Sequence, residues 1–343
     1  MIIETCAYGR AGLIGNPSDG YFGKTIAVIL RNFAANVVCF ESPRLSIEPC
    51  QQDNMTFNSL AELSEDVRLN GYYGGLRLIK AAIKRFNDYC ELNDITLEAR
   101  NFTMEYRSNI PVRVGLAGSS GIVTATMRAL MSFYNVSIAD YELANLTLSV
   151  ELEELGIGAG LQDRVVQAYE GAVFMDFDKS LMEERGHGHY ESLSPESLPP
   201  LFVAYHDGLA EGTELSHNDL RSRFNRGDPA VLAAMEEFAG LAQSARDLLS
   251  KGKGDQIGPL LSENFALRTR TIDVSEGNKR LVQIAEQQGA HAKLAGSGGA
   301  VIGVYDGDPQ RFDLLLKAYQ SMGAKTIHPT IKDKDKRKGK GES

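Results

Sequence analysis

The segment Val112–Leu130, VRVGLAGSSGIVTATMRAL, constrains this chain more than any other stretch of its sequence. Three glycines and two adjacent serines precede apolar residues with helical spacing, which predicts a tight loop leading into a helix that ends near Phe133. Glycine lets a backbone turn its N–H groups inward, and the start of a helix carries a partial positive charge. Such a loop either caps a helix, for which Ser-Ser-Gly is a good beginning, or cradles a phosphate.

Two further glycine-rich segments lie on either side of it, AYGRAGLIGNPSDGYFG at 7–23 and KLAGSGGAVIGVY at 293–305. No GxxxxGK[ST] sequence occurs, which excludes a P-loop enzyme. GIGAG at 156–160 and GSGGAVIG at 296–303 have the wrong spacing for a dinucleotide fingerprint, so a dinucleotide site is disfavoured. The third glycine segment is either a close-packed hairpin or a turn that presses backbone amides toward a substrate.

Two carboxylates follow the central loop, with Glu151 twelve residues before Asp163. Phosphoryl transfer from ATP needs oxygen ligands for Mg²⁺ and a group that orients or deprotonates the acceptor hydroxyl. A glutamate on a helix and an aspartate beyond a glycine loop can divide these two tasks. Each also has a simpler reading, because Glu151 lies in an acidic run typical of a solvated face and Asp163 lies near a helix start.

The coarse pattern is that of an α+β chain of two domains. Apolar runs predict strands at 2–9, 24–30, 34–42, 43–49, 95–114, 172–178, 201–207 and 325–331, and two strands about a glycine turn within 291–307. Helical spacing predicts helices at 72–90, 118–133, 140–158 and 161–169, three segments within 212–289, and one at 309–319. Residues 179–200 are expected to form a linker or a long excursion. We expect domains at 1–190 and 191–331, followed by a basic, disordered tail at 332–343.

Composition narrows the classes of function. The net charge of −9 argues against nucleic acid as a partner, and the apolar runs are too short to span a membrane. Four cysteines without metal-ligand spacing are typical of reduced thiols, and the first residues show no secretory signal, so we expect a cytoplasmic protein. The histidines of GHGHY at 186–190 are expected at the surface rather than on a metal.

The three glycine segments, in this order and separation, resemble the motifs of the GHMP kinase superfamily. Within it, RAGLIGNPSDGYFGKT, YYGGLRL, ELGIGAGLQDRVVQAYEGAVFMDF, NFALRTR and KLAGSGGAV are similar to the glucuronokinases, notably in Gly-Asn-Pro-Ser-Asp where galactokinases have Gly-Glu-His-x-Asp. The resemblance implies a two-domain α+β fold, with the active site in a cleft between an N-terminal nucleotide-binding half and a C-terminal ferredoxin-like half. It also implies ATP and Mg²⁺ as cofactors, and phosphorylation of the anomeric hydroxyl of D-glucuronate to give the 1-phosphate.

The resemblance further assigns roles to individual positions. Asp163 matches the carboxylate that takes or orients the acceptor proton, and Arg10 a basic residue beside the transferred phosphoryl group. Ser120 and Glu151 match the Mg²⁺ ligands, and Ser119 is expected to cap the helix or contact phosphate. The phosphate cradle corresponds to Gly115, Ala117, Gly118, Ser119, Ser120 and Gly121. Positions that contact or close over the sugar correspond to Asn16, Asp19, Gly296, Ser297 and Gly298. Gly121 departs from the alanine of many relatives, which should loosen the helix start slightly.

A uronate acceptor also needs a partner for its carboxylate, ideally an arginine. The candidates are Arg113, Arg221, Arg223, Arg268 and Arg270. Arg268 and Arg270 lie two residues apart on an expected helix, so at most one of them points into the site. Two alternatives stay open: a GHMP kinase for another sugar or a small alcohol, and a sugar- or nucleotide-binding regulator without turnover. We expect a monomer or a homodimer.

Overall fold

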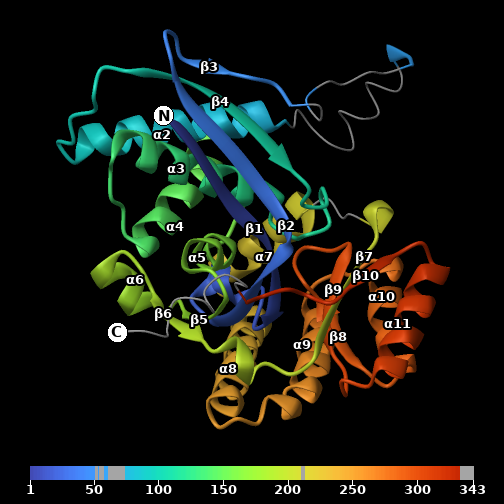
Figure 1. Cartoon of the computed structure of the whole chain (residues 1–343). Helices are drawn as coiled ribbons and strands as arrows, with labels where there is room; N and C mark the ends of the chain where they lie inside the picture. The colour runs from blue at the N-terminus through green and yellow to red at the C-terminus, as the bar shows by residue number, and fades with distance from the viewer. Residues whose placement is uncertain (51–52, 54–57, 61–73, 210–212, 333–343) are drawn as a thin grey trace, which may run out of the picture.

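The computed structural model describes residues 1–50, 53, 58–60, 74–209 and 213–332 of the chain, and the basic segment expected at 332–343 lies, apart from Lys332, outside these residues. The described residues form two sheets, in which most strand pairs are antiparallel, and the helices around them (Figure 1). The strands are β1 (Ile2–Ile14), β2 (Lys24–Ser42), β3 (Ser46–Ile47), β4 (Asn101–Ser108), β5 (Ala172–Asp176), β6 (His189–Leu193), β7 (Leu201–Tyr205), β8 (His291–Leu294), β9 (Ala300–Val304) and β10 (Lys325–Ile327).

Helices separate most of these strands. They are α2 (Gly75–Leu92), α3 (Gly118–Tyr134), α4 (Asp140–Ser149), α5 (Leu161–Tyr169), α6 (Lys179–Arg185), α7 (Thr213–Asn225), α8 (Pro229–Ser250), α9 (Gly258–Thr271), α10 (Glu276–Gln287) and α11 (Pro309–Ser321), with a π-helical turn, η3, at Val150–Glu154. None of the helices formed by the described residues is long and apolar enough to cross a bilayer.

Strand β2 is the central strand of the first sheet. It pairs with β1 along most of its length, with β5 through Lys24–Val28 and with β4 through Ala35–Ser42. The sequence predicted two separate strands here, because Arg31 and Asn32 interrupt the apolar run. They form one strand because β1 pairs with β2 on both sides of the interruption, with Gly9 opposite Leu30 and Tyr8 opposite Ala34. Within it, the Arg31 amide donates to the Thr330 carbonyl at 2.8 Å.

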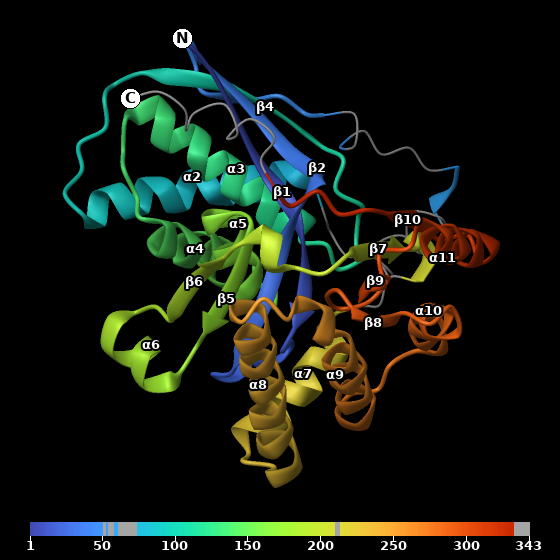
Figure 2. The same ribbon diagram turned by 60° about the horizontal axis from the view of Figure 1, so that its bottom comes forward.

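Burial along β1 and β2 explains their residues. From Ala11 to Ile14 and from Thr25 to Leu30 every residue is buried, so both faces of this end of the sheet are covered. Strands buried on both faces have continuous runs of apolar residues. Near Val37, buried and more exposed residues alternate, which is typical of a strand with one face exposed to solvent. Helix α3, buried on almost all sides, covers this sheet, and α8 packs on β2 from the second half of the chain (Figure 2).

The segment 179–200 is more structured than the sequence predicted. Asp178 accepts hydrogen bonds from the amides of Ser180 and Leu181 and starts α6, and β6 pairs with β5 at the edge of the first sheet. Its polar residues made β6 look like a linker, but an edge strand needs few apolar side chains. The domain boundary expected at 190/191 falls inside β6, and the two sheets are connected by residues 194–200.

The second half contains a four-stranded antiparallel sheet in the order β10-β7-β9-β8. Taken with α10 and α11, this is the β-α-β-β-α-β arrangement of ferredoxin-like folds, as expected. Four helices, not three, fill 213–287, because Gly227 takes a left-handed conformation and Asp228 caps α8. The larger buried cluster runs from β1 and β2 into α8 and α9, so the two halves share one core.

Candidate active site

Arg10 lies where four segments of the chain meet. Its guanidinium donates to Asp163 Oδ1 through Nε at 2.5 Å, and through Nη1 to the carbonyl oxygens of Gly115 and Ala295. The backbones also join here, since the Arg10 amide donates to Leu116 at 3.1 Å and the Gly12 amide to Ala295 at 2.7 Å. The three glycine segments and Asp163, far apart in the sequence, therefore form one site with residues from both halves.

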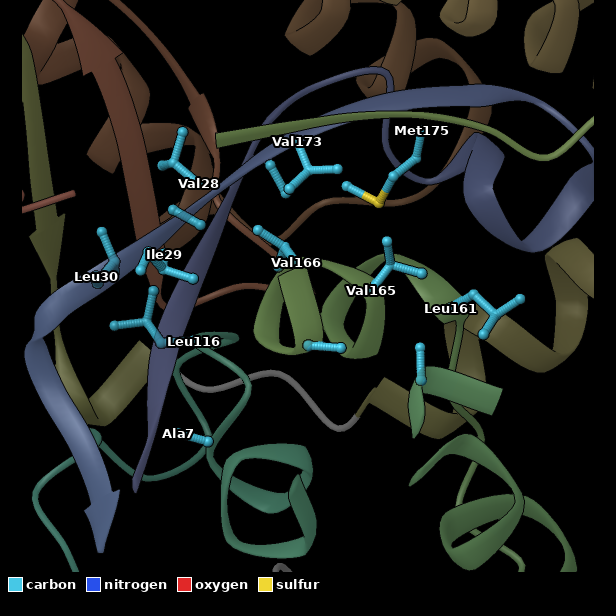
Figure 3. Close-up of a cluster of buried hydrophobic side chains, with 14 of the residues drawn as sticks. Ala7, Val28, Ile29, Leu30, Leu116, Leu161, Val165, Val166, Val173 and Met175 are labelled. Atoms are coloured by element: carbon cyan, nitrogen blue, oxygen red, sulfur yellow. The ribbon is translucent and has the colours of Figure 1, made fainter. Parts of the chain in front are cut away.

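Asp163 is held by the packing of α5. Figure 3 shows Leu161, Val165 and Val166 on this helix directed into the apolar cluster that also contains Val173 and Met175 of β5. The carboxylate lies on the other side of α5, with 18% of its side chain exposed. Arg164, the next residue, contacts Asp163 Oδ2 at 3.2 Å, so two guanidinium groups face this one acid.

The charges around the two acids shift their pKa values in opposite directions. Burial alone would raise the pKa of Asp163, but Arg10 and Arg164 outweigh it and hold that pKa below its usual range. Burial, and then the negative charge of Asp163, raise the pKa of Asp19 to about 6. Asp163 is therefore the carboxylate that stays ionised at neutral pH, while Asp19 titrates closer to neutrality.

Glu151 lies on the π-helical turn η3 and is completely buried. Its Oε1 accepts a hydrogen bond from Ser119 Oγ at 2.7 Å, and its Oε2 pairs with Arg164. It is thus not part of a solvated face. The sequence paired Ser120 with Glu151, but the hydroxyl that contacts Glu151 belongs to Ser119, because the Ser120 side chain turns into the fold and donates to the Ala117 carbonyl at 3.3 Å.

The loop before α3 has the backbone of an anion cradle. Gly115 and Ala117 adopt left-handed conformations with φ of 69° and 62°, and α3 begins directly afterwards at Gly118. The first amides of a helix have no partner within that helix and favour negative charge. At Gly121 an added Cβ would lie 2.9 Å from Ile110 Cδ1, the far end of a flexible side chain that can shift to make room.

The third glycine segment packs directly on the first loop. A Cβ at Gly296 would collide with the Gly115 carbonyl and approach Arg10 Nη1 at 3.0 Å, and a Cβ at Gly115 would lie 2.9 Å from the Ser297 amide. A Cβ at Gly298 would lie 2.8 Å from the Asn278 amide group. The turn between β8 and β9 can therefore approach the loop this closely only with glycine at these positions.

Replacing Gly296 with Ala is expected to destabilise the protein by about 1–3 kcal/mol through overpacking, and to lower turnover because Arg10 and Gly115 must move. Urea unfolding and ADP release would measure both effects. Gly240→Ala on α8 is the control, since nothing lies near its added Cβ, and alanine should stabilise that helix by about 0.5–1 kcal/mol. A Gly296→Ala protein with unchanged stability and turnover would contradict this packing.

Asn16 is tied to the second half of the chain. Lys293 on β8 is fully buried, and its ammonium donates to the Gly12 carbonyl at 2.8 Å, to Asn16 Oδ1 at 2.5 Å and to the Leu294 carbonyl at 2.7 Å. Asn264 on α9 accepts from the Gly15 amide at 2.7 Å. Burial, followed by the charges of Arg268 and Arg10, lowers the pKa of Lys293 well below its usual range, and Asp19 acts in the opposite direction.

The five arginines that are candidates for binding a substrate carboxylate differ in their burial and in their partners. Arg223 pairs with Asp228 and Arg270 with Glu237, on the surface. Arg268 is buried and donates to the Ser297 carbonyl at 3.2 Å, so of the two arginines on α9 it is the one that faces the site. Arg221 stacks over the Tyr21 ring at 4.6 Å and donates to the Gly20 carbonyl at 2.7 Å, next to Asp19. Arg113 has a left-handed backbone in the loop before Gly115.

A cavity of about 420 Å³ lies beside the π-helical turn. It is formed between the first turns of α2 and the residues that follow Glu151, and its lining comprises Leu76, Arg77, Lys80, Ala81, Lys84, Glu154 and Leu155. The wall combines aliphatic surface with lysine and arginine side chains, which suits a flat ring that carries a phosphate chain.

Sequence reasoning missed Arg164, Asn264 and Lys293. Arg164 is adjacent to Asp163 in the sequence, and an acid followed directly by an arginine on a short helix is a visible signal. Lys293 stands among apolar residues in a strand that precedes a glycine turn, and a lysine in a strand buried on both faces needs a partner. Asn264 left no comparable signal, because a buried asparagine on a helix is recognised only through its contacts.

Comparisons with known proteins agree with this geometry. The GHMP kinases N terminal domain matches residues 77–171, and the GHMP kinases C terminal domain matches residues 245–324. Glucuronokinase 1 of Arabidopsis thaliana is 39% identical over 333 residues, covering 95% of this chain and 91% of that protein. Probable glucuronokinase 2 of the same plant is 39% identical over 329 residues, covering 94% and 89%.

The fold has counterparts among solved structures. The crystal structure of Lactococcus lactis galactokinase complexed with galactose superposes with a TM-score of 0.74 at 16% sequence identity, covering 96% of this chain and 93% of that one. With two matching domains and relatives at 39% identity along nearly its whole length, the chain belongs to the GHMP kinase family.

Proposed function

We propose that this protein transfers the γ-phosphoryl group of ATP to the anomeric hydroxyl of D-glucuronate, producing D-glucuronate 1-phosphate and ADP. The observation that carries the proposal is the contact of Arg10 with Asp163, Gly115 and Ala295, which brings an ionised carboxylate next to two glycine loops. Similarity to two glucuronokinases over almost the whole chain supports glucuronate as the acceptor.

Asp163 is the group that receives the acceptor proton. The anomeric oxygen forms a bond to the γ-phosphorus, its proton passes to the Asp163 carboxylate, and the bond from phosphorus to the leaving oxygen breaks, so ADP departs with the electron pair. Because Arg10 and Arg164 hold the pKa of Asp163 low, the carboxylate is available at neutral pH and its main effect is to orient the hydroxyl. Arg10 offsets negative charge on the transferred group.

The phosphates lie at the loop formed by Gly115, Ala117, Gly118, Ser119, Ser120 and Gly121. Inward amides and the start of α3 bind negative charge there without a lysine side chain. The cavity between α2 and η3 is the place for the adenosine, because η3 also carries Glu151 and the cavity combines apolar walls with basic side chains.

The donor set near the phosphates fits Mg²⁺. Magnesium in kinases is held by one or two carboxylates together with substrate phosphates and water, and Glu151 Oε1 lies 2.7 Å from Ser119 Oγ. Among the described residues no three acidic, histidine or cysteine side chains are placed so that they could hold a metal ion together, so the phosphates would supply most ligands. Glu151 and Ser119 would hold the ion, which would neutralise charge on the β- and γ-phosphates. The place of Ser120 among the ligands remains a prediction.

The acceptor side would be formed by Asn16, Asp19, Gly296, Ser297 and Gly298, with Arg268 and Arg221 as the arginines nearest to it. The four cysteines are unpaired, which supports a reducing compartment such as the cytoplasm. Function as a sugar- or nucleotide-binding regulator is the alternative from a different class, and retention of Asp163, Arg10 and Glu151 in one site argues against it.

A panel of acceptors tests the proposal. ADP release would be measured with MgATP and D-glucuronate, D-galacturonate, D-galactose or mevalonate, and we expect kcat/KM to be highest for glucuronate. Omission of Mg²⁺ should abolish ADP release with every acceptor. A glucuronate rate no better than that of the neutral sugar would point to another acceptor, and no release with any acceptor would favour the regulator.

A further inference from the structure

The orientation of the Asn16 side-chain amide is fixed by Lys293, whose Nζ group donates to Asn16 Oδ1. A lysine ammonium has three donors and no acceptor, and here three oxygens surround it: two backbone carbonyls and Asn16 Oδ1. The oxygen of the Asn16 amide must therefore face Lys293. Its Nδ2 group is directed elsewhere and makes no hydrogen bond with the described residues, although only 4% of Asn16 is exposed.

No acidic side chain among the described residues lies in contact with the Lys293 Nζ group, which has only oxygen acceptors around it. It forms no ion pair with the acidic side chains that the structure describes, although it is fully buried on a strand. The charges that act on it are those of Arg268 and Arg10, both positive, and that of Asp19, a carboxyl whose pKa is itself raised to about 6. A buried cation with neutral partners is costly unless a negative charge arrives nearby.

The residue at position 16 is suited to an anion. An aspartate or glutamate there would pair with Lys293 and repel a carboxylate, whereas this chain has asparagine. Asparagine instead accepts the hydrogen bond from Lys293 on its oxygen and keeps an N–H donor on its Nδ2 group, which that bond polarises. Hydrogen bonds from such donors to charged acceptors are stronger than those between neutral groups.

We propose that Asn16 Nδ2 binds the carboxylate of an anionic sugar acceptor and that Lys293 is the positioning residue that holds the amide for this contact. This inference rests on the proposed function and names the residues by which that site distinguishes a uronate from a neutral sugar. Lys293 acts through its hydrogen bond to Asn16 Oδ1, without touching the substrate.

The variant Asn16→Asp tests this assignment and separates it from a purely structural role. Aspartate keeps the size of asparagine and gives Lys293 an ionic partner, so thermal stability should be retained or raised. The donor is lost and a like charge replaces it, so we expect the Kd for D-glucuronate, measured by calorimetry with ADP present, to rise about 10- to 100-fold. The Kd for ADP should stay within twofold of the wild type. The control Asn145→Asp adds the same charge on α4, and its Kd for D-glucuronate should also stay within twofold of the wild type.

A Kd for glucuronate unchanged in a stably folded Asn16→Asp protein would overturn the inference, and so would an equal weakening of ADP binding. Lys293→Met gives a second measurement: if it folds, affinity for glucuronate should fall further than affinity for D-glucose. Failure of the proposed function looks different. If the wild-type protein binds glucuronate through Asn16 but releases no ADP, phosphorylation is refuted and the role of Asn16 in recognition stands. If the wild-type protein phosphorylates glucuronate but Asn16→Asp leaves the Kd for glucuronate unchanged, phosphorylation stands and the role of Asn16 is refuted.

Discussion

Asp163→Asn is expected to lower kcat by about 10²–10⁴-fold, the range typical of a lost general base, with little effect on nucleotide binding. The amide has the shape of the carboxylate but cannot accept the proton of the anomeric hydroxyl. It would still lie beside Arg10 and Arg164, so the positions of Gly115 and Ala295 should hold. ADP release and calorimetric ADP binding, measured on the same preparation, would separate the two effects.

The control for this experiment is Asp140→Asn, which removes an exposed carboxylate in the first turn of α4. Its turnover should equal that of the wild type. Because the pKa of Asp163 is lowered, acidification should reduce activity only below the usual titration range of an aspartate, as the carboxylate becomes protonated. Full turnover in Asp163→Asn would remove this residue from the chemistry and leave it a structural partner of Arg10.

Arg164→Met is expected to destabilise the protein by about 3–5 kcal/mol, the usual effect of breaking a buried ion pair from one side. Glu151 has no exposed surface, so without Arg164 its carboxylate keeps only the Ser119 hydrogen bond. Urea unfolding would measure the change. The double variant Glu151→Gln/Arg164→Met should recover a large part of the stability, because no uncompensated charge remains, while its turnover stays low.

A surface pair provides the matched control for Arg164. Arg246 pairs with Glu191 at 2.9 Å, but about one third of each side chain is exposed. Arg246→Met should therefore cost no more than about 1 kcal/mol. Equal losses for the two methionine variants would contradict the view that burial makes the Glu151–Arg164 pair important.

Much of this site was predictable because it is encoded locally. Glycine spacing, an apolar run and two serines predict the loop at Gly115 and the start of α3, and the helix that holds Asp163 follows from its short periodic pattern. The two-domain α+β fold and the ferredoxin-like second half, expected from the family resemblance, are confirmed by the sheet order and by the similar proteins.

Other features depend on long-range packing that local patterns do not contain. Adjacent residues on a helix point about 100° apart, and only the position of η3 decides that Ser119 rather than Ser120 contacts Glu151. Strand β6 consists mainly of polar residues and became a strand through its pairing with β5. Lys293 and Asn16 are separated by 277 positions, so neither residue type alone indicates their hydrogen bond.

The contact of Arg10 with Ala295 has a consequence for how the protein is made. These residues are 285 positions apart, so synthesis of the first strand precedes synthesis of one of its partners by most of the chain. A growing polypeptide can complete the phosphate loop and α5 early, but Arg10 lacks one of its carbonyl acceptors until β8 and the turn after it have left the ribosome. Contacts this distant in sequence form late because loop closure is slow. The enzyme should thus acquire its acceptor side among the last steps of folding, after the nucleotide side has formed.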